Sequence, residues 1–262
     1  MDRLSFINIF LAIIYVFLAI FSQKIFNYFV IILILLIGMP HGAFDFYILK
    51  KNLLVKKDFI SIVAYLFLPF LAYMLWFFLP SIFWPLFFIC SFTHFYQVEM
   101  EGRPKEAMPS IAFFSVYCLP FIYQSEWLIY MKELNGSDWA SFLINIKYYV
   151  ITTFFIILFR RIFKNQLSFV YFIYSILFFI TVLFTNLIAS FMFFFIFIHS
   201  KKHLLANKLL SLKRYITIVL PISFLFVFGS FYLSSYSVPI LSVVLCLAFI
   251  TFPHFYLDLK RD

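Results

Sequence analysis

Long apolar runs alternate with short polar stretches along the whole chain. A helix that crosses the hydrocarbon core of a bilayer needs about 20 predominantly apolar residues, and the runs here have about that length. The sequence divides into ten of them, at residues 4–22, 26–49, 58–79, 82–100, 107–130, 139–159, 167–184, 187–203, 215–234 and 238–259. The pattern predicts an all-α fold, a polytopic transmembrane bundle of ten helices, in a single integral membrane domain over residues 1–262.

The basic residues between these runs are distributed unequally over the two sides of such a bundle. Seventeen Lys and Arg residues lie on the side that holds both chain ends, and only Lys24 and Lys132 lie on the opposite side. Cytoplasmic loops carry an excess of basic residues, so we expect both termini in the cytoplasm and the protein in the cell (inner) membrane. The polar residues Gln124, Glu126 and Lys147 fall inside the fifth and sixth runs. If those two runs lay partly at the interface, eight crossings would give the same orientation.

Composition agrees with lipid as the main solvent. Hydrophobic residues make up 65% of the chain and charged residues only 12%, whereas a soluble domain is about half apolar and about a quarter charged. The net charge of +9 comes from residues in short loops, so it indicates membrane topology and gives no reason to expect nucleic acid as a partner. The three cysteines are far apart and in apolar runs, which argues against a disulfide framework or a thiolate metal site.

The five histidines all lie in apolar runs or at their ends. His41 and His94 each precede a basic loop residue by nine positions, about 13 Å along a helix, and the others are also near the cytoplasmic ends of parallel helices. His199 and His203 are four residues apart, which places both on one helical face. Two such imidazoles can bind one metal ion, and His41 and His94 can complete a four-histidine site from neighbouring helices.

A second pattern surrounds two of these histidines. Pro40-His41 and Pro253-His254 are each followed, one turn later, by an aspartate, Asp45 and Asp258. Such an aspartate can accept the second imidazole N–H, as partners of metal-bound histidines usually do. His254 is thus a candidate fifth ligand or a residue that positions the others. A lone histidine within a membrane can also simply hydrogen-bond another helix. Neutral imidazoles suit Zn, Cu, Fe or Ni, and the spacing does not choose among these metals.

At these residues the sequence resembles the Brp/Blh family of β-carotene 15,15′-dioxygenases. The resemblance is carried by residues 38–45 (GMPHGAFD), 91–95 (SFTHF), 199–203 (HSKKH) and 252–254 (FPH). It implies a non-haem Fe(II) enzyme that uses O₂ to cleave the central double bond of β-carotene into two retinal molecules. The implied iron ligands are His41, His94, His199 and His203. Tyr96 stands where the family typically has glycine, a departure that concerns the shape of the cavity near His94.

Other functions remain open at this point. The chain can be an iron oxygenase that acts on another membrane lipid, a bis-histidine haem protein, or a non-enzymatic carotenoid- or retinal-handling protein that supports a rhodopsin. A histidine-box desaturase requires more histidines than the five present. A carotenoid would need an aromatic-lined tunnel, and six residues are candidates for its lining because they are near the histidines in sequence: Phe95, Tyr96, Phe195, Phe197, Phe255 and Tyr256.

Overall fold

The structure is a computed structural model that describes residues 3–38, 59–100, 113–163, 169–200 and 240–259, and the single position 221. Over these ranges the chain is helical and contains no strand, so the prediction of an all-α fold is confirmed. Within the same ranges, no single helix combines the length and the apolar character that a membrane crossing requires.

Five helices begin and end within a few residues of the apolar runs. They are α1 (Arg3–Phe21), α4 (Phe59–Phe78), α5 (Pro80–Met100), α11 (Phe169–Phe184) and α16 (Ile240–Leu259). Two further runs change their winding partway along: α2 (Gln23–Leu33) continues into the π-helical segment η1 (Ile34–Gly38), and α12 (Leu187–Phe193) continues into η3 (Phe194–Ser200). The predicted run at 215–234 lies outside the described ranges apart from Pro221.

The prediction of two continuous helices over 107–130 and 139–159 is wrong. The described part of the first region consists of η2 (Phe114–Cys118), α7 (Leu119–Ile122) and α8 (Gln124–Glu133), and the second consists of α9 (Ser137–Asn145) and α10 (Lys147–Phe163). These breaks coincide with the polar residues inside both runs: Gln124 begins α8 and Lys147 begins α10. Average apolarity therefore identified the helical regions but not the points at which the backbone turns.

The turn between α8 and α9, which separates the two runs, is stabilised by backbone hydrogen bonds. Asn135 has a positive φ of 58°, a conformation that asparagine tolerates better than most residues. Its N–H donates to the carbonyl of Lys132 at 3.3 Å, and the N–H of Gly136 donates to the carbonyl of Met131 at 2.7 Å. This pair of hydrogen bonds is the Schellman arrangement that ends many helices, and it reverses the chain into α9.

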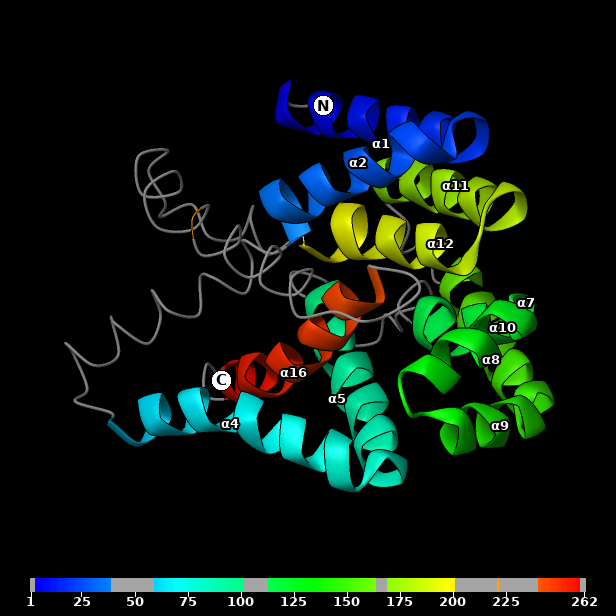
Figure 1. Ribbon diagram of the computed structural model, residues 1–262. Helices are drawn as coiled ribbons and strands as arrows, with labels where there is room; N and C mark the ends of the chain where they lie inside the picture. The colour runs from blue at the N-terminus through cyan, green and yellow to red at the C-terminus, as the bar shows by residue number, and fades with distance from the viewer. Residues whose placement is uncertain are drawn as a thin grey trace.

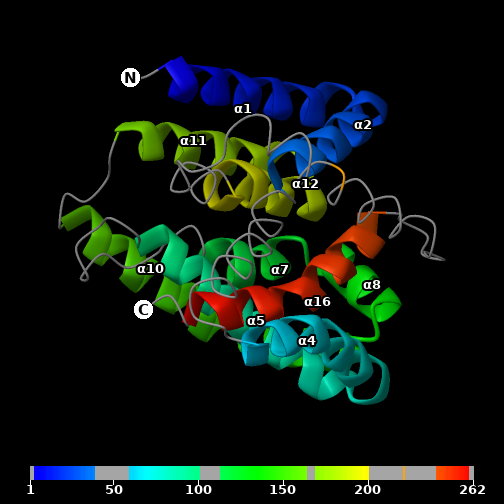
Figure 2. The ribbon, with the colours of Figure 1, turned by 90° about the vertical axis from the view of Figure 1, so that its left-hand side faces the viewer.

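The helices form two layers with a smaller group at one side (Figures 1 and 2). In one layer α1 packs on α11, with α2 and α12 beside them; in the other, α16 packs against α4 and α5. Helices α7 to α10 form the side group. The buried hydroxyl of Tyr15 in α1 donates to the carbonyl of Ala189 in α12 at 2.7 Å, which links elements that are distant in sequence. The space between the layers holds the candidate site.

Candidate metal centre and cavity

Three histidines from three different helical elements meet in the interior. His94 is in α5, His199 in η3 and His254 in α16, and each side chain is at most 3% exposed. The Nε2 atoms of His94 and His199 are 3.1 Å apart. The ring centroid of His94 is 4.7 Å from that of His199 and 4.4 Å from that of His254, both edge-to-face. These residues are separated by up to 160 positions in the chain, so their meeting is a property of the fold.

The other predicted site residues are not placed by the structure. His41, His203 and Asp45 lie outside the described residues. Asp258 is in the last turn of α16, and its side chain is not among those described. Within the described ranges, no group of three or more His, Cys, Asp or Glu side chains is arranged so that it could hold a metal ion. The part of the predicted ligand set that can be located is therefore the pair His94 and His199.

Within the described ranges, the π-helical segments η1, η2 and η3 lie close to this cluster. Segment η1 contacts η3, and α5 contacts both η2 and η3. His199 belongs to η3, and η1 ends at Gly38, three residues before His41. Each π turn inserts an extra residue into a helix and so rotates the side chains that follow it, and such turns are frequent at functional sites.

Gly38 allows η1 and η3 to approach each other. A Cβ atom at Gly38 would stand 2.9 Å from Cε1 of Phe195, which is closer than carbon atoms pack. The ring of Phe195 in turn stacks on His199, with centroids 5.8 Å apart at 27°. On its other side His199 meets Phe95 edge-to-face at 4.4 Å. Glycine at this position thus fixes the aromatic surroundings of His199.

The orientation of α12 and η3 also depends on hydrogen bonds at the N-terminus of α12. The side chain of Asn186 accepts from the N–H of Ala189 at 2.9 Å, and the carboxylate of Glu126 in α8 accepts from the N–H of Leu187 at 3.0 Å. Both groups satisfy N–H donors that a helix leaves unpaired at its start. A negative carboxylate there is also favourable to the helix dipole. The side group of helices is in this way joined to the element that carries His199.

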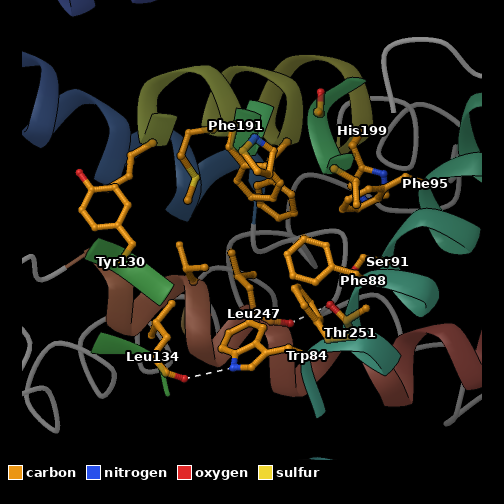
Figure 3. A pocket seen from close by; sticks show the side chains of 18 of the residues that line it. Trp84, Phe88, Ser91, Phe95, Tyr130, Leu134, Phe191, His199, Leu247 and Thr251 are labelled. Atoms are coloured by element: carbon orange, nitrogen blue, oxygen red, sulfur yellow. Dashed lines mark hydrogen bonds between the residues drawn. The ribbon is translucent and has the colours of Figure 1, made fainter. Parts of the chain in front are cut away.

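The histidines lie at one end of a cavity of about 280 Å³. Its lining comes from α4, α5, η2, α7, α8, α12, η3 and α16 and is almost entirely aromatic and aliphatic. Figure 3 shows His199 and Phe191 at the top of the view, with Trp84 and Leu134 at the bottom, Tyr130 at the left and Phe95 at the right. The few polar groups include Ser91, Ser115 and Thr251. A mostly apolar lining of this kind is typical of sites for apolar ligands.

Sequence proximity to the histidines found only part of this lining. Of the six aromatic candidates, Phe95 and Phe195 line the described cavity. The ring of Tyr96 instead packs against Phe92 with centroids 6.3 Å apart, so the departure at Tyr96 does not alter the described lining. The residues that sequence reasoning missed, among them Trp84, Trp127 and Met131, are far from any histidine in sequence. In the sequence, the only feature that marked them was a large side chain close to polar residues within or beside an apolar run.

Comparison with known proteins identifies the family to which the chain belongs. The sequence profile described as Beta-carotene 15,15'-dioxygenase matches residues 32–259. This range contains all five histidines and every element that lines the cavity. No curated protein and no solved structure matches the chain. Because the match covers most of the chain, including the buried histidines and the apolar cavity beside them, the chain belongs to the β-carotene 15,15′-dioxygenase family.

Proposed function

We propose that the protein is a membrane-embedded non-haem iron dioxygenase that cleaves the central double bond of β-carotene with O₂ to give two molecules of retinal. The observation that carries this proposal is the cluster of His94, His199 and His254 at one end of an apolar cavity, in a chain of this family. The histidines offer ligands, and the cavity offers a dry site for a hydrocarbon.

The spacing of the pair His94 and His199 is compatible with a shared metal ion. Two imidazole nitrogens that bind one ion, each at about 2.1 Å, lie close to each other. The Nε2 atoms of His94 and His199 are 3.1 Å apart. We propose that His41 and His203 complete the set, that Asp45 orients His41, and that Asp258 orients His254. Four neutral imidazoles suit iron, and bound Fe(II) would supply the site at which O₂ is activated.

The chain's own residues would bind and orient the substrate. In the overall reaction the central C=C bond of β-carotene and the O–O bond break, and two C=O bonds form, so that all atoms of both reactants are in the two retinal molecules. The aromatic lining would hold the polyene and exclude water, which protects the reactive centre from side reactions. Phe95 and Phe195, packed against His199, would limit the positions that the polyene can take beside the histidines.

Membrane embedding is supported by the surface as well as by the sequence. Large apolar side chains on α1 are more than half exposed, among them Phe6, Phe10, Phe17 and Phe21. Such a surface is costly in water and favourable in lipid. The charge asymmetry of the loops supports a topology with both termini in the cytoplasm. A site inside the bilayer would receive β-carotene directly from the lipid phase and release retinal there, where a rhodopsin could bind it.

The experiment is expression in cells that make β-carotene, followed by purification and metal analysis. We expect loss of the yellow colour, accumulation of retinal and about one iron per chain. Iron with unchanged β-carotene would indicate an oxygenase for another membrane lipid. Bound carotenoid or retinal without iron or turnover would indicate a handling protein that supports a rhodopsin, since the apolar cavity would serve that role too.

A further inference from the structure

The end of the cavity away from His199 is a rigid wall, here called the end wall, formed by Trp84, Met131 and Leu134. All three side chains line the cavity and are at most 3% exposed. Figure 3 shows Trp84 and Leu134 joined by a hydrogen bond on the side of the cavity away from His199. In this bond the indole N–H of Trp84 donates to the carbonyl of Leu134 at 3.2 Å.

Several contacts prevent this wall from moving. Trp76 in α4 donates a second indole hydrogen bond to the same Leu134 carbonyl at 2.8 Å. Behind the wall, a Cβ atom at Gly136 would overlap Cε of Met131 and stand 2.7 Å from Nε1 of Trp84. There is thus no free space behind Met131 and Trp84 into which they could retreat. The Schellman turn at Asn135 fixes the backbone at the same place.

The distance from the wall to the histidines is set by one helix. Trp84 and His94 are both in α5 and both line the cavity. Ten residues of helix correspond to about 15 Å. This is close to the length of retinal, that is, of one half of β-carotene from the central double bond to the far side of its end ring. A rigid wall at this distance would stop the ring when the central bond is beside the histidines.

We propose that the end wall binds one end ring of the carotenoid and thereby selects the bond that is cleaved. This inference rests on the proposed function and adds its positional specificity. A ring is the bulkiest part of the substrate, and contact with Trp84 and Met131 buries it against large polarizable side chains. The polyene itself is uniform along its length, so side-wall contacts alone distinguish poorly between neighbouring double bonds.

Substitutions of Met131 should change the depth of the cavity at the end wall. The lengths of the cleavage products then show where the substrate's ring stops. Met131→Ala deepens the cavity, so the ring should travel further and the cleavage should shift away from the centre, giving one apocarotenal longer and one shorter than retinal. Leu143→Ala is the matched control, because Leu143 is also buried but belongs to α9 and is not among the residues that line the cavity. It should give retinal as the only cleavage product. Met131→Val removes less volume and takes the place of alanine if the latter unfolds.

Binding to metal-free protein tests the wall independently of chemistry. Met131→Phe fills the ring position and should weaken β-carotene binding about tenfold, the effect expected of an overfilled site, as measured from the absorption and circular dichroism of the polyene. Leu143→Ala should change this affinity by much less. Unshifted products with Met131→Ala, or unchanged affinity with Met131→Phe, would overturn the proposal. A wild-type protein that binds β-carotene through Met131 but yields no retinal would contradict the proposed reaction and leave the wall supported.

Discussion

The two ends of the cavity are built on different principles. At the histidine end, His199 lies in a π-helical segment that contacts a second one, and large aromatic rings surround it. At the wall end, the chain uses ordinary helix termini, a Schellman turn and two indole hydrogen bonds to one carbonyl. One end collects ionisable side chains from distant segments, and the other consists of apolar side chains on closely spaced helices.

This difference suggests separate roles for the two ends: reaction chemistry at the histidine end and substrate fit at the wall end. Imidazoles are more polar than the aromatic rings around them, so we expect the histidine end to serve binding more than packing. The wall end has conventional, well-satisfied contacts and is expected to contribute stability. Substitutions at the first end should therefore remove activity with modest effects on folding, and substitutions at the second should mainly change stability and fit.

Removal of a histidine ligand should have the largest effect. We expect His199→Ala to reduce iron content to background and turnover by more than about 100-fold, because loss of a ligand exceeds the usual effect of losing its supporting partner. Metal analysis and retinal formation measure the two quantities. Thr93→Ala is the control, since its hydroxyl only bonds the carbonyl of Ile89 within α5. Full iron content and turnover in His199→Ala would exclude the proposed ligand set.

His254 tests whether the whole cluster binds the metal. Its ring meets His94 edge-to-face with centroids 4.4 Å apart, so we expect it to position His94. His254→Gln should then keep the iron while turnover falls about 10–100-fold, the usual range for a supporting residue. Iron content and turnover must be measured on the same preparation. Loss of iron from this variant would instead make His254 a fifth ligand.

Gly136 tests the tight packing behind the wall. A Cβ at this position meets Met131 and Trp84 at less than 3 Å, so Gly136→Ala should lower the free energy of unfolding by about 1–3 kcal/mol, as other overpacked sites do. Denaturant unfolding in detergent measures this change. Ser137→Ala, at the neighbouring exposed position, should be close to neutral. Equal stability of the two variants would show that Met131 and Trp84 can shift to accommodate the extra methyl group.

The smallest effect is expected at the helix start that precedes His199. Asn186→Ala removes the side chain that accepts from the N–H of Ala189 and should cost about 1 kcal/mol of stability, a typical value for loss of an N-cap. The same unfolding measurement applies. Asn145→Ala, an exposed asparagine at the end of α9, is the matched control. A loss of iron in Asn186→Ala larger than its loss of stability would place this cap among the elements that hold the metal centre.

The sequence by itself predicted the helical class and the boundaries of most helices, because runs of apolar residues of nearly constant length leave few alternatives. It also singled out His94, His199 and His254, since ionisable groups are rare in such runs. The breaks at the starts of α8 and α10 were not predicted as such. Polar residues within the runs hinted at them, but a helix end depends on which partners its terminal groups find, and those partners belong to other helices.

Only the tertiary structure decided which residues meet. The i,i+4 pair His199 and His203 is local and can be read from spacing, whereas the contact of His94 with His199 and His254 joins three distant segments. The same holds for the end wall. Trp84 and Leu134 are 50 residues apart in the chain, and the hydrogen bond between them cannot be predicted from sequence periodicity. Periodicity reports which face of a helix is apolar. It does not report which helices pack together. That choice, and with it the size of the cavity between the helices, depends on the packing of all helices together.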